Sequence, residues 1–174
     1  MNNIKVNSLL ILLVCLTVFA CTEKKEEPTA KPEPVSFRHG DECHVCGMII
    51  SNFPGPKGQV IVEKSHHVLK FCSTRDMFSW LLQPENINRD HTLYVHDMAR
   101  SDWENPNDTA LINAREAFYV VGSGRKGAMG PTLAAFAVRS EAAAFAGKHG
   151  GKVVAFSEIT MDHLTRGLVE SEAQ

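Results

Sequence analysis

Three things that the sequence lacks narrow its function before any motif is considered. It has no large excess of charge, since its formal net charge is −2 at pH 7, and this argues against nucleic-acid binding. It has no Ser/His/Asp arrangement, paired carboxylates or phosphate loop in a context that supports catalysis. It has one Cys-x-x-Cys pair but no second, although zinc sites commonly use two such pairs or one pair with two nearby histidines.

The N-terminus also lacks an apolar run long enough to span a membrane. Residues 7–20 are mostly apolar, but a spanning helix needs roughly 20 apolar residues. After the single cation Lys5, this layout is typical of a secretory signal peptide. The run ends at Val18–Cys21, which resembles a bacterial lipoprotein cleavage box in spite of the bulky Phe19. We therefore expect a lipid on Cys21.

The next segment, residues 22–35, is rich in Lys, Glu, Pro and Thr, a composition that buries too little apolar surface to fold. We predict a lipoprotein signal peptide at 1–20, a lipid-anchored flexible linker at 21–36 and one folded domain at 37–174. A plain secreted protein cleaved near Ala20 is the alternative. A lipid would hold the domain at a membrane surface without spanning the membrane.

The folded part is predicted to be an α+β domain of two similar ββα units packed together, at about 37–90 and 115–169. In each unit, two strand-like runs precede a helix with an apolar face. The expected strands are 59–63, 67–72, 92–97, 117–121, 132–137 and 152–156, and the expected helices are 77–82, 141–148 and 157–169.

Matched spacing indicates that the two units are a duplication. Pro84 is expected to end the first helix, because proline breaks a helix interior, and Ser140 to cap the second. We expect the stretch 99–113 to be a long loop. The residues that match in spacing are Phe71 with Phe136, Trp80 with Phe145 and Asp76 with Glu141.

The cysteine count constrains the chemistry. Of five cysteines, Cys15 lies in the predicted signal and Cys21 at the lipid site, which leaves Cys43, Cys46 and Cys72. An odd number of thiols outside the cytoplasm argues against a simple disulfide framework. A thiol left over must be buried, metal-bound or reactive. Cys72 ends a predicted strand on its apolar side, as an ordinary buried cysteine does, and is a secondary ligand candidate.

The segment Cys43–Met48 places two thiols and a thioether close together. Polarizable sulfur ligands favour Cu(I), whereas carboxylate and water suit harder cations. Met129 lies ahead of the inner strand of the second unit as Met48 does in the first, and a glycine adjoins each. Quasi-symmetry would bring both thioethers to one interface, where glycine lets the backbone approach a metal closely.

Histidine offers another ligand, because a three-coordinate Cu(I) site accepts an imidazole. His96 and His66 are the candidates, although each also fits a surface or hydrogen-bonded role. Two further interpretations of Cys43 and Cys46 stay open. One is a structural disulfide, which gains little from closing so tight a loop. The other is a thioredoxin-like redox pair, which needs a strand feeding a helix, whereas residues 47–50 look extended.

In combination, several motifs resemble the nitrous oxide reductase accessory lipoprotein family, NosL. The resemblance covers essentially the whole mature domain, and it is specific as a combination although no single piece is. The motifs that carry it are the lipoprotein signal, Cys43–Met48, Phe53–Lys57, Phe78–Leu82, Met129–Gly130 and Ala144–Gly151.

The resemblance implies a Cu(I) chaperone, lipid-anchored with palmitate on the periplasmic side of a bacterial membrane, the outer one in preference to the inner. Such a protein delivers copper to a membrane-associated maturation complex, an ABC transporter with a periplasmic β-helical protein. Nitrous oxide reductase, an enzyme of denitrification, is the final recipient. The implied fold has two ββα lobes and is similar to an organomercurial lyase lobe. By position, Cys46 and Met48 are the primary ligands, followed by Met129 and then Cys43.

Two other classes of function compete with a chaperone. A thiol-based redox or organomercurial-lyase-like enzyme would use Cys43, Cys46 and Cys72, and it predicts substrate turnover without copper. A lipid-tethered scaffold with an incidental disulfide predicts no metal uptake under reducing conditions. A chaperone needs no catalytic group, but it needs an exposed edge so that a partner's ligand enters before its own ligand leaves.

Overall fold

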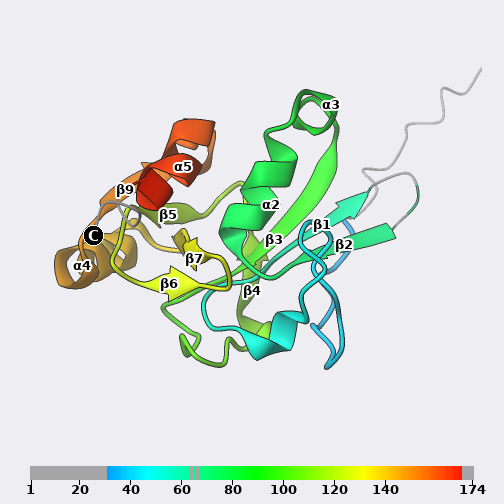
Figure 1. Ribbon diagram of the computed structural model, residues 1–174, viewed down its shortest axis with the longest axis horizontal. Coiled ribbons are helices and arrows are strands. Elements are labelled where there is room, and N and C mark those ends of the chain that lie inside the picture. Colours follow the sequence, from blue (N-terminus) through cyan, green and yellow to red (C-terminus); the bar gives the residue numbers. More distant parts are fainter. Residues whose placement is uncertain (1–30, 63–64, 66, 170–174) are drawn as a thin grey trace, which may run out of the picture. The chain divides into compact units, whose positions relative to one another are not determined.

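The computed structural model describes residues 31–62, 65 and 67–169, which form an α+β fold around two antiparallel sheets (Figure 1). The predicted signal peptide, Cys21 and His66 lie outside the described residues. Among the helices that are described, none combines the length and the apolar character needed to cross a membrane.

The first sheet has four strands in the order β2-β1-β3-β4. Gly58 in the central strand β1 lies opposite Phe71 of β2 on one side and Val95 of β3 on the other. Helix α2 (Thr74–Leu81) covers this sheet, with Met77 and Phe78 buried beneath it. The strands are β1 (Gly58–Val62), β2 (His67–Phe71), β3 (His91–His96) and β4 (Leu111–Asn113).

The second sheet has three strands in the order β8-β5-β9. Phe118 in the central strand β5 lies opposite Phe136 of β8 and Ala155 of β9. Helix α4 (Arg139–His149) packs across all three strands. The strands are β5 (Phe118–Val121), β8 (Ala134–Phe136) and β9 (Lys152–Ala155).

Strands β2, β1 and β3 of the first sheet have the same order and register as the three strands of the second sheet. In each, the first strand of the unit is central, the second flanks it, and the strand after the helix returns to its other side. The rings that match in spacing also match in space: the centroids of Phe71 and Trp80 are 5.9 Å apart, and those of Phe136 and Phe145 are 5.2 Å apart. The predicted α+β fold is confirmed, and the repeat extends to the third strands β3 and β9.

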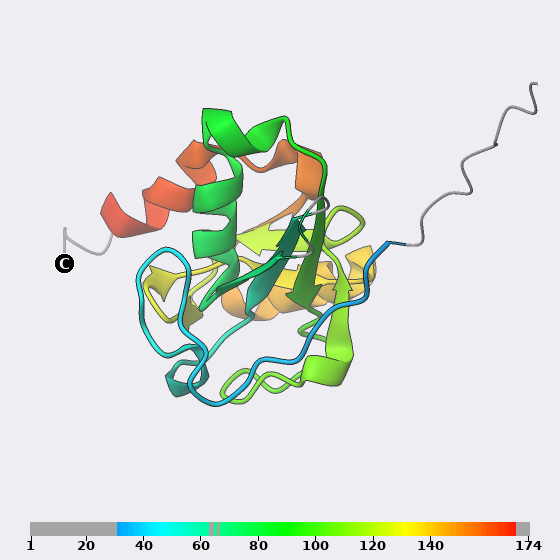
Figure 2. The same cartoon turned by 90° about the vertical axis from the view of Figure 1, so that its right-hand side faces the viewer.

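Smaller elements join the two units. The Gly-rich turn contains a short hairpin of β6 (Lys126–Gly127) and β7 (Gly130–Pro131). The final helix, α5 (Met161–Val169), lies beside α2 (Figure 2). The remaining elements are α3 (Pro84–Ile87) and the 3-10 helices η1 (Ile50–Asn52), η2 (Asp108–Ala110) and η3 (Phe156–Glu158).

Two local predictions were wrong in detail, and a third was incomplete. Ser140 does not cap α4, because that helix begins at Arg139, and Val138 occupies the cap position without a side-chain hydrogen bond. Pro84 does more than end α2, since it opens α3 at a position where a missing N–H costs nothing. The stretch 99–113 is not all loop, because it contains η2 and β4, which extends the first sheet.

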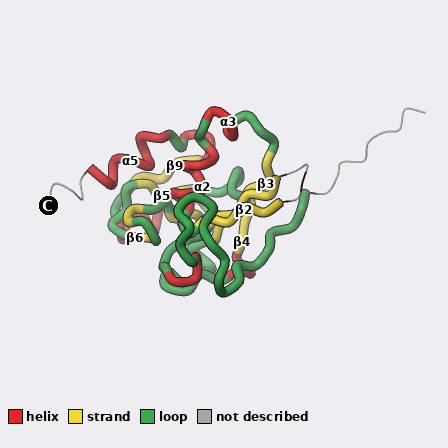
Figure 3. Tube along the Cα trace, turned by 45° about the vertical axis from the view of Figure 1, so that its right-hand side comes forward, coloured by secondary structure: helices red, strands yellow, loops and turns green. Residues whose placement is uncertain are grey.

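A continuous core joins the two units. Phe78 of α2 meets Tyr119 of β5 edge to face, with ring centroids 5.1 Å apart, and the buried Tyr119 hydroxyl donates to the Ala114 carbonyl at 2.7 Å. The N-terminal segment, drawn as loop in Figure 3, also contacts the first sheet. Val35 exchanges two backbone-to-side-chain hydrogen bonds with Gln59 of β1.

Candidate metal centre

The Cys43–Met48 segment forms a closed loop. The Cys43 N–H donates to the Met48 carbonyl at 2.9 Å, and the Gly47 N–H donates to the Cys43 carbonyl at 2.8 Å. Gly47 has a φ of 71°, a conformation that costs glycine little. A side chain at Gly47 or Gly130 would meet nothing within 4 Å, so these glycines serve the backbone conformation rather than a close approach.

The loop is attached to the end of β2. The His44 N–H donates to the Lys70 carbonyl at 2.8 Å. The His44 ring packs edge-on against Phe71 and Trp80, with centroids 6.0 and 6.1 Å away. These contacts place both loop thiols beside Cys72, the residue that follows Phe71.

Four ligand-type side chains converge at this point: the thiols of Cys43, Cys46 and Cys72 and the carboxylate of Asp76. Their ligand atoms all lie within 4.8 Å of one another. The Sγ atoms of Cys46 and Cys72 are 3.5 Å apart, and the Cys72 thiol donates to Asp76 Oδ2 at 3.0 Å. Cys46 is half-buried whereas the other three are buried, so the cluster opens to solvent at Cys46.

The start of α2 fixes two of these side chains. Ser73 caps the helix by accepting a hydrogen bond from the Asp76 N–H at 3.0 Å. This cap sets the first turn, so that Asp76 lies back over Cys72, four residues earlier. The cluster therefore combines a local pair that spans the start of α2, Cys72 before the cap and Asp76 within the helix, with a local pair from the loop.

Hydrogen bonding within the cluster separates the thiol pKa values. The neighbouring Cys72 side chain, helped by backbone N–H groups of Cys72, Cys46 and Val45, lowers the pKa of the Cys43 thiol. The same contact with Cys43, followed by burial and by Asp76, raises the pKa of Cys72. Burial raises the pKa of Cys46. These shifts run in opposite directions because the thiols contact one another, and a thiolate is the form that binds metal.

The two predicted thioethers differ in their surroundings and exposure. Met48 is half-buried against the main core. Met129 is 45% exposed at the tip of the β6–β7 hairpin, and its carbonyl accepts a hydrogen bond from Arg75 Nη1 at 2.9 Å. Because Arg75 neighbours Asp76 in α2, this bond ties the hairpin to the helix turn that carries the cluster.

The predicted histidines are not members of the cluster within the described part of the chain. His96 is buried, and both ring nitrogens have partners: Nδ1 accepts from the Lys57 N–H at 3.1 Å, and Nε2 lies 3.3 Å from Asp108 Oδ1. Burial lowers the pKa of His96 to about 4. His66 lies outside the described residues.

The Phe53–Lys57 motif has a local structural role. The Lys57 ammonium is buried and donates to the carbonyls of Phe53 and Pro54, at 2.5 and 3.0 Å. Gly55 approaches the hairpin so closely that a side chain there would meet the Gly127 Cα at 3.2 Å. The motif therefore closes its own turn and packs it against the second unit.

The sequence analysis did not group Asp76 with the three thiols and treated Cys72 as a secondary ligand candidate, whereas the structure places both side chains in the cluster. The sequence did contain an indication of this pair, because Cys72 and Asp76 are four residues apart and lie on either side of Ser73, a candidate helix cap. The argument that zinc lacks further ligands also fails as stated, because Cys72 and Asp76 supply a third and a fourth donor. Zinc binds both thiolate and carboxylate donors. Cu(I) favours the three thiols over the carboxylate.

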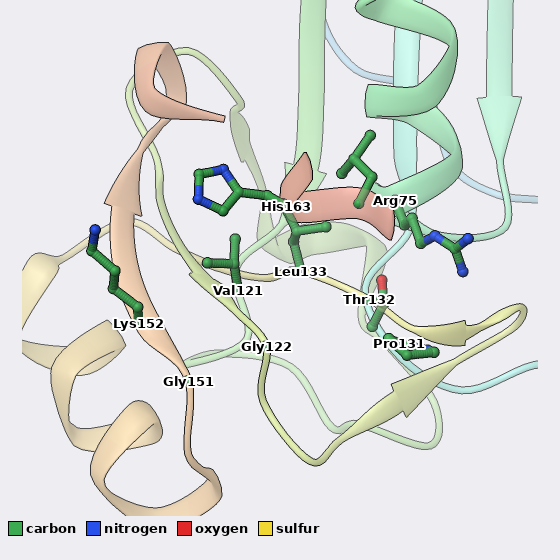
Figure 4. Close-up of a pocket in the computed structure, with 10 residues that line it drawn as sticks. Arg75, Val121, Gly122, Pro131, Thr132, Leu133, Gly151, Lys152 and His163 are labelled. Carbon is green, nitrogen blue, oxygen red and sulfur yellow. The ribbon is translucent and has the colours of Figure 1, made fainter. Parts of the chain in front are cut away.

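A cavity of about 280 Å³ is lined in part by Arg75. Figure 4 shows that the charged groups of Arg75 and Lys152 and the ring of His163 point in different directions, so they do not converge on a common ligand. Apolar side chains of Val121, Leu133 and Leu164 form the rest of its wall, together with Gly122, Gly151, Pro131 and Thr132.

The fold and the cluster together define a class: a small α+β protein that presents a sulfur-rich candidate metal site at the start of a helix. Residues 34–164 match the family model described as NosL. The chain belongs to the NosL family, which confirms the resemblance.

Known relatives agree with this assignment. The copper-binding lipoprotein NosL of Stutzerimonas stutzeri is 53% identical over 159 residues, which are 91% of this chain and 82% of the relative. The protein of the same name from Achromobacter cycloclastes is 43% identical over 120 residues, which are 67% of this chain and 62% of the relative. The crystal structure of the copper chaperone NosL from Shewanella denitrificans has a TM-score of 0.73 at 48% identity, and the match covers 75% of this chain and 98% of that one. These names describe copper binding and a chaperone rather than an enzyme.

Proposed function

We propose that the protein is a periplasmic Cu(I) metallochaperone that supplies copper for assembly of the copper centres of nitrous oxide reductase. The observation that carries this proposal is the convergence of Cys43, Cys46 and a third thiol within 4.8 Å, with Cys46 at the open edge. Soft sulfur donors select Cu(I). The relatives named for copper binding and for a chaperone support the same function.

The proposed ligands are Cys46 and Met48, with Met129 and Cys43 completing the set. Cys43 and Cys46 are already together, and the Arg75 hydrogen bond holds the Met129 backbone beside the helix turn of the cluster. The exposed thioether of Met129 gives the ion a soft donor on the solvent side. A partner's ligand then enters from that side before Cys46 leaves, so transfer requires no catalytic residue.

The proposed setting is the periplasmic face of a bacterial membrane, with the domain tethered through a lipid on Cys21. The lipoprotein names of the two curated relatives support the anchor. The proposed recipient is a membrane-associated maturation complex, an ABC transporter with a periplasmic β-helical protein, with nitrous oxide reductase as the final acceptor. A tether favours such a transfer because it raises the local concentration of donor and acceptor at one surface.

An anaerobic titration of the reduced full-length chain with Cu(I), against a competing chelator, tests the binding function. Loss of a residue that only orients a metal ligand weakens metal binding by roughly 10- to 100-fold. Cys46→Ser removes a ligand itself, so it is expected to weaken Cu(I) binding by more than that. Met129→Ala should weaken it less. Matched controls are Val45→Ala in the same loop and Met161→Ala at another exposed methionine, and both should bind as the wild type does.

Delivery needs a separate measurement. The copper content of nitrous oxide reductase is compared in cells that make the wild type, Cys46→Ser or Met161→Ala, and only Cys46→Ser should yield copper-poor enzyme. Unchanged Cu(I) affinity in Cys46→Ser would overturn the proposed site, and fully metallated enzyme in those cells would overturn the proposed delivery.

A further inference from the structure

Cys72 occupies the centre of the cluster, although it is not among the ligands proposed above. Its Sγ atom lies 3.5 Å from that of Cys46 and it is completely buried. Buried cysteines are often simply small apolar side chains. Here, however, the side chain faces two other thiols and a carboxylate rather than only hydrocarbon.

The second unit shows that the scaffold does not require a thiol at this position. Cys72 follows Phe71 at the end of β2, and the equivalent residue after Phe136 at the end of β8 is Ala137. Strand order, pairing register and the aromatic pair are otherwise the same. A cysteine in the first unit is therefore not explained by packing of the repeat.

We propose that Cys72 is a third sulfur ligand, and that Cys43, Cys46 and Cys72 form a buried holding site for Cu(I) that is distinct from the thioether donors used in hand-over. This inference rests on the proposed copper function and assigns a new ligand to the same site. Asp76 positions the Cys72 side chain through the 3.0 Å hydrogen bond.

The separations between the sulfur atoms suit a single ion. With a metal–thiolate bond of about 2.3 Å, as for zinc, three sulfurs around one ion in a plane lie about 4 Å apart. The observed sulfurs are all within 4.8 Å, and one pair is at 3.5 Å. Small rotations of the side chains therefore close the site around an ion without movement of the backbone.

The three thiols and the thioether of Met129 differ in burial, and this difference suits them to different tasks. Cys43 and Cys72 are 3% and 0% exposed, whereas Met129 is 45% exposed, and Cys46 is intermediate. Buried thiolates keep the ion from stray thiols in solution, and an exposed thioether offers it to a partner. Cys46 belongs to both groups, so it is the ligand through which the ion passes from one to the other.

Cys72→Ala tests this assignment, because it copies Ala137 and should preserve the fold. The full-length reduced chain is titrated anaerobically with Cu(I), and the number of sulfur neighbours of copper is measured by X-ray absorption. We expect at least a 10-fold loss of affinity, by comparison with outer-shell losses of roughly 10- to 100-fold, and the loss of one sulfur neighbour. Ala137→Ser serves as the matched control and should change neither quantity. A urea unfolding midpoint near that of the wild type shows that the variant is folded.

Cys72→Ser is a second variant, which keeps a small polar side chain in case the alanine destabilises the chain, and it should lose the same sulfur neighbour. Wild-type affinity and an unchanged sulfur count in both variants would overturn the assignment of Cys72. The same conclusion follows if a parallel Zn²⁺ titration shows that the variants lose zinc while retaining Cu(I). If the wild type itself takes up no Cu(I), the proposed function fails. If Cys46→Ser loses copper and Cys72→Ala does not, only the present inference fails.

Discussion

The two units place different side chains on one framework of strands and helix. At the ends of β2 and β8, Cys72 in the first unit corresponds to Ala137 in the second. On the helices, the buried Asp76 corresponds to the half-buried Glu141. At the ends of β3 and β9, the buried His96 corresponds to the half-buried Phe156, as the matching strand registers require.

This comparison distinguishes the residues that stabilise the fold from those that form the candidate metal site. Both units keep the aromatic contact between strand end and helix, at 5.9 Å for Phe71 with Trp80 and at 5.2 Å for Phe136 with Phe145. Only the first unit combines that contact with the loop Cys43–Met48. The second unit instead offers the exposed hairpin with Met129. The two units thus carry different sulfur-containing side chains on the same framework.

The largest expected difference between the units is in the unfolding free energy lost when matched helix residues at the shared core are substituted. Phe78 is 1% exposed and contacts Tyr119 across the two units, whereas the equivalent helix residue Ala143 is exposed. Phe78→Ala should cost about 3–5 kcal/mol of unfolding free energy, the usual loss for a buried phenylalanine. Ala143→Ser should change it by about 0.5 kcal/mol or less, as surface substitutions do. Urea denaturation of both variants measures the contrast, and comparable losses would contradict a core that is anchored from the first unit.

The buried His96 should make the first unit sensitive to acid. Burial lowers the pKa of His96 from 6.5 to about 4, so the unfolded chain takes up its proton before the folded chain does. The stability that this neutral histidine contributes is complete above pH 6.5. It is lost as the pH falls toward 4, at a slope of at most about 1.4 kcal/mol per pH unit.

His96→Phe, which copies Phe156, tests that effect. The variant leaves the Lys57 N–H without its 3.1 Å partner, so its stability at pH 7 should be lower. The informative quantity is therefore the slope of unfolding free energy between pH 7 and pH 5, which should be shallower in the variant. His39→Phe, at an exposed histidine, is the control and should retain the wild-type slope. Equal slopes in His96→Phe and the wild type would rule out His96 as the source.

Local patterns in the sequence predicted most of the strands and helices. The duplication could be predicted because the spacing of aromatic residues such as Phe71 and Trp80 recurs in the second unit, and this spacing can be read directly from the sequence. The capping of α4 was predicted wrongly, since Ser140 and Val138 both precede an Ala-rich run, and the sequence does not show at which residue the backbone turns helical. Cap position depends on where β8 ends, which sheet pairing decides.

Of the four side chains in the cluster, the sequence analysis brought only the local pair Cys43 and Cys46 together. Cys43 and Cys46 are close in sequence, so their proximity in space needed no knowledge of the fold. Cys72 joins them because the His44 N–H binds the Lys70 carbonyl, a contact between residues distant in the chain. Such long-range contacts depend on strand pairing and loop closure together, which hydrophobic periodicity does not encode.

The smallest difference expected between the units lies at the helix starts. Ser73 caps α2 through the Asp76 N–H, whereas Val138 leaves the start of α4 without a side-chain cap. Ser73→Ala should therefore cost about 1 kcal/mol of unfolding free energy. Val138→Ser should do the opposite, because Val138 has an extended backbone and Glu141 lies three residues later, as a capping box requires. We expect a gain of about 0.5–1 kcal/mol, measured by urea denaturation of the copper-free chain, with Ala144→Ser on the exposed face of α4 as the control. If Val138→Ser gained nothing beyond that control, the missing cap would not be what distinguishes the two helix starts.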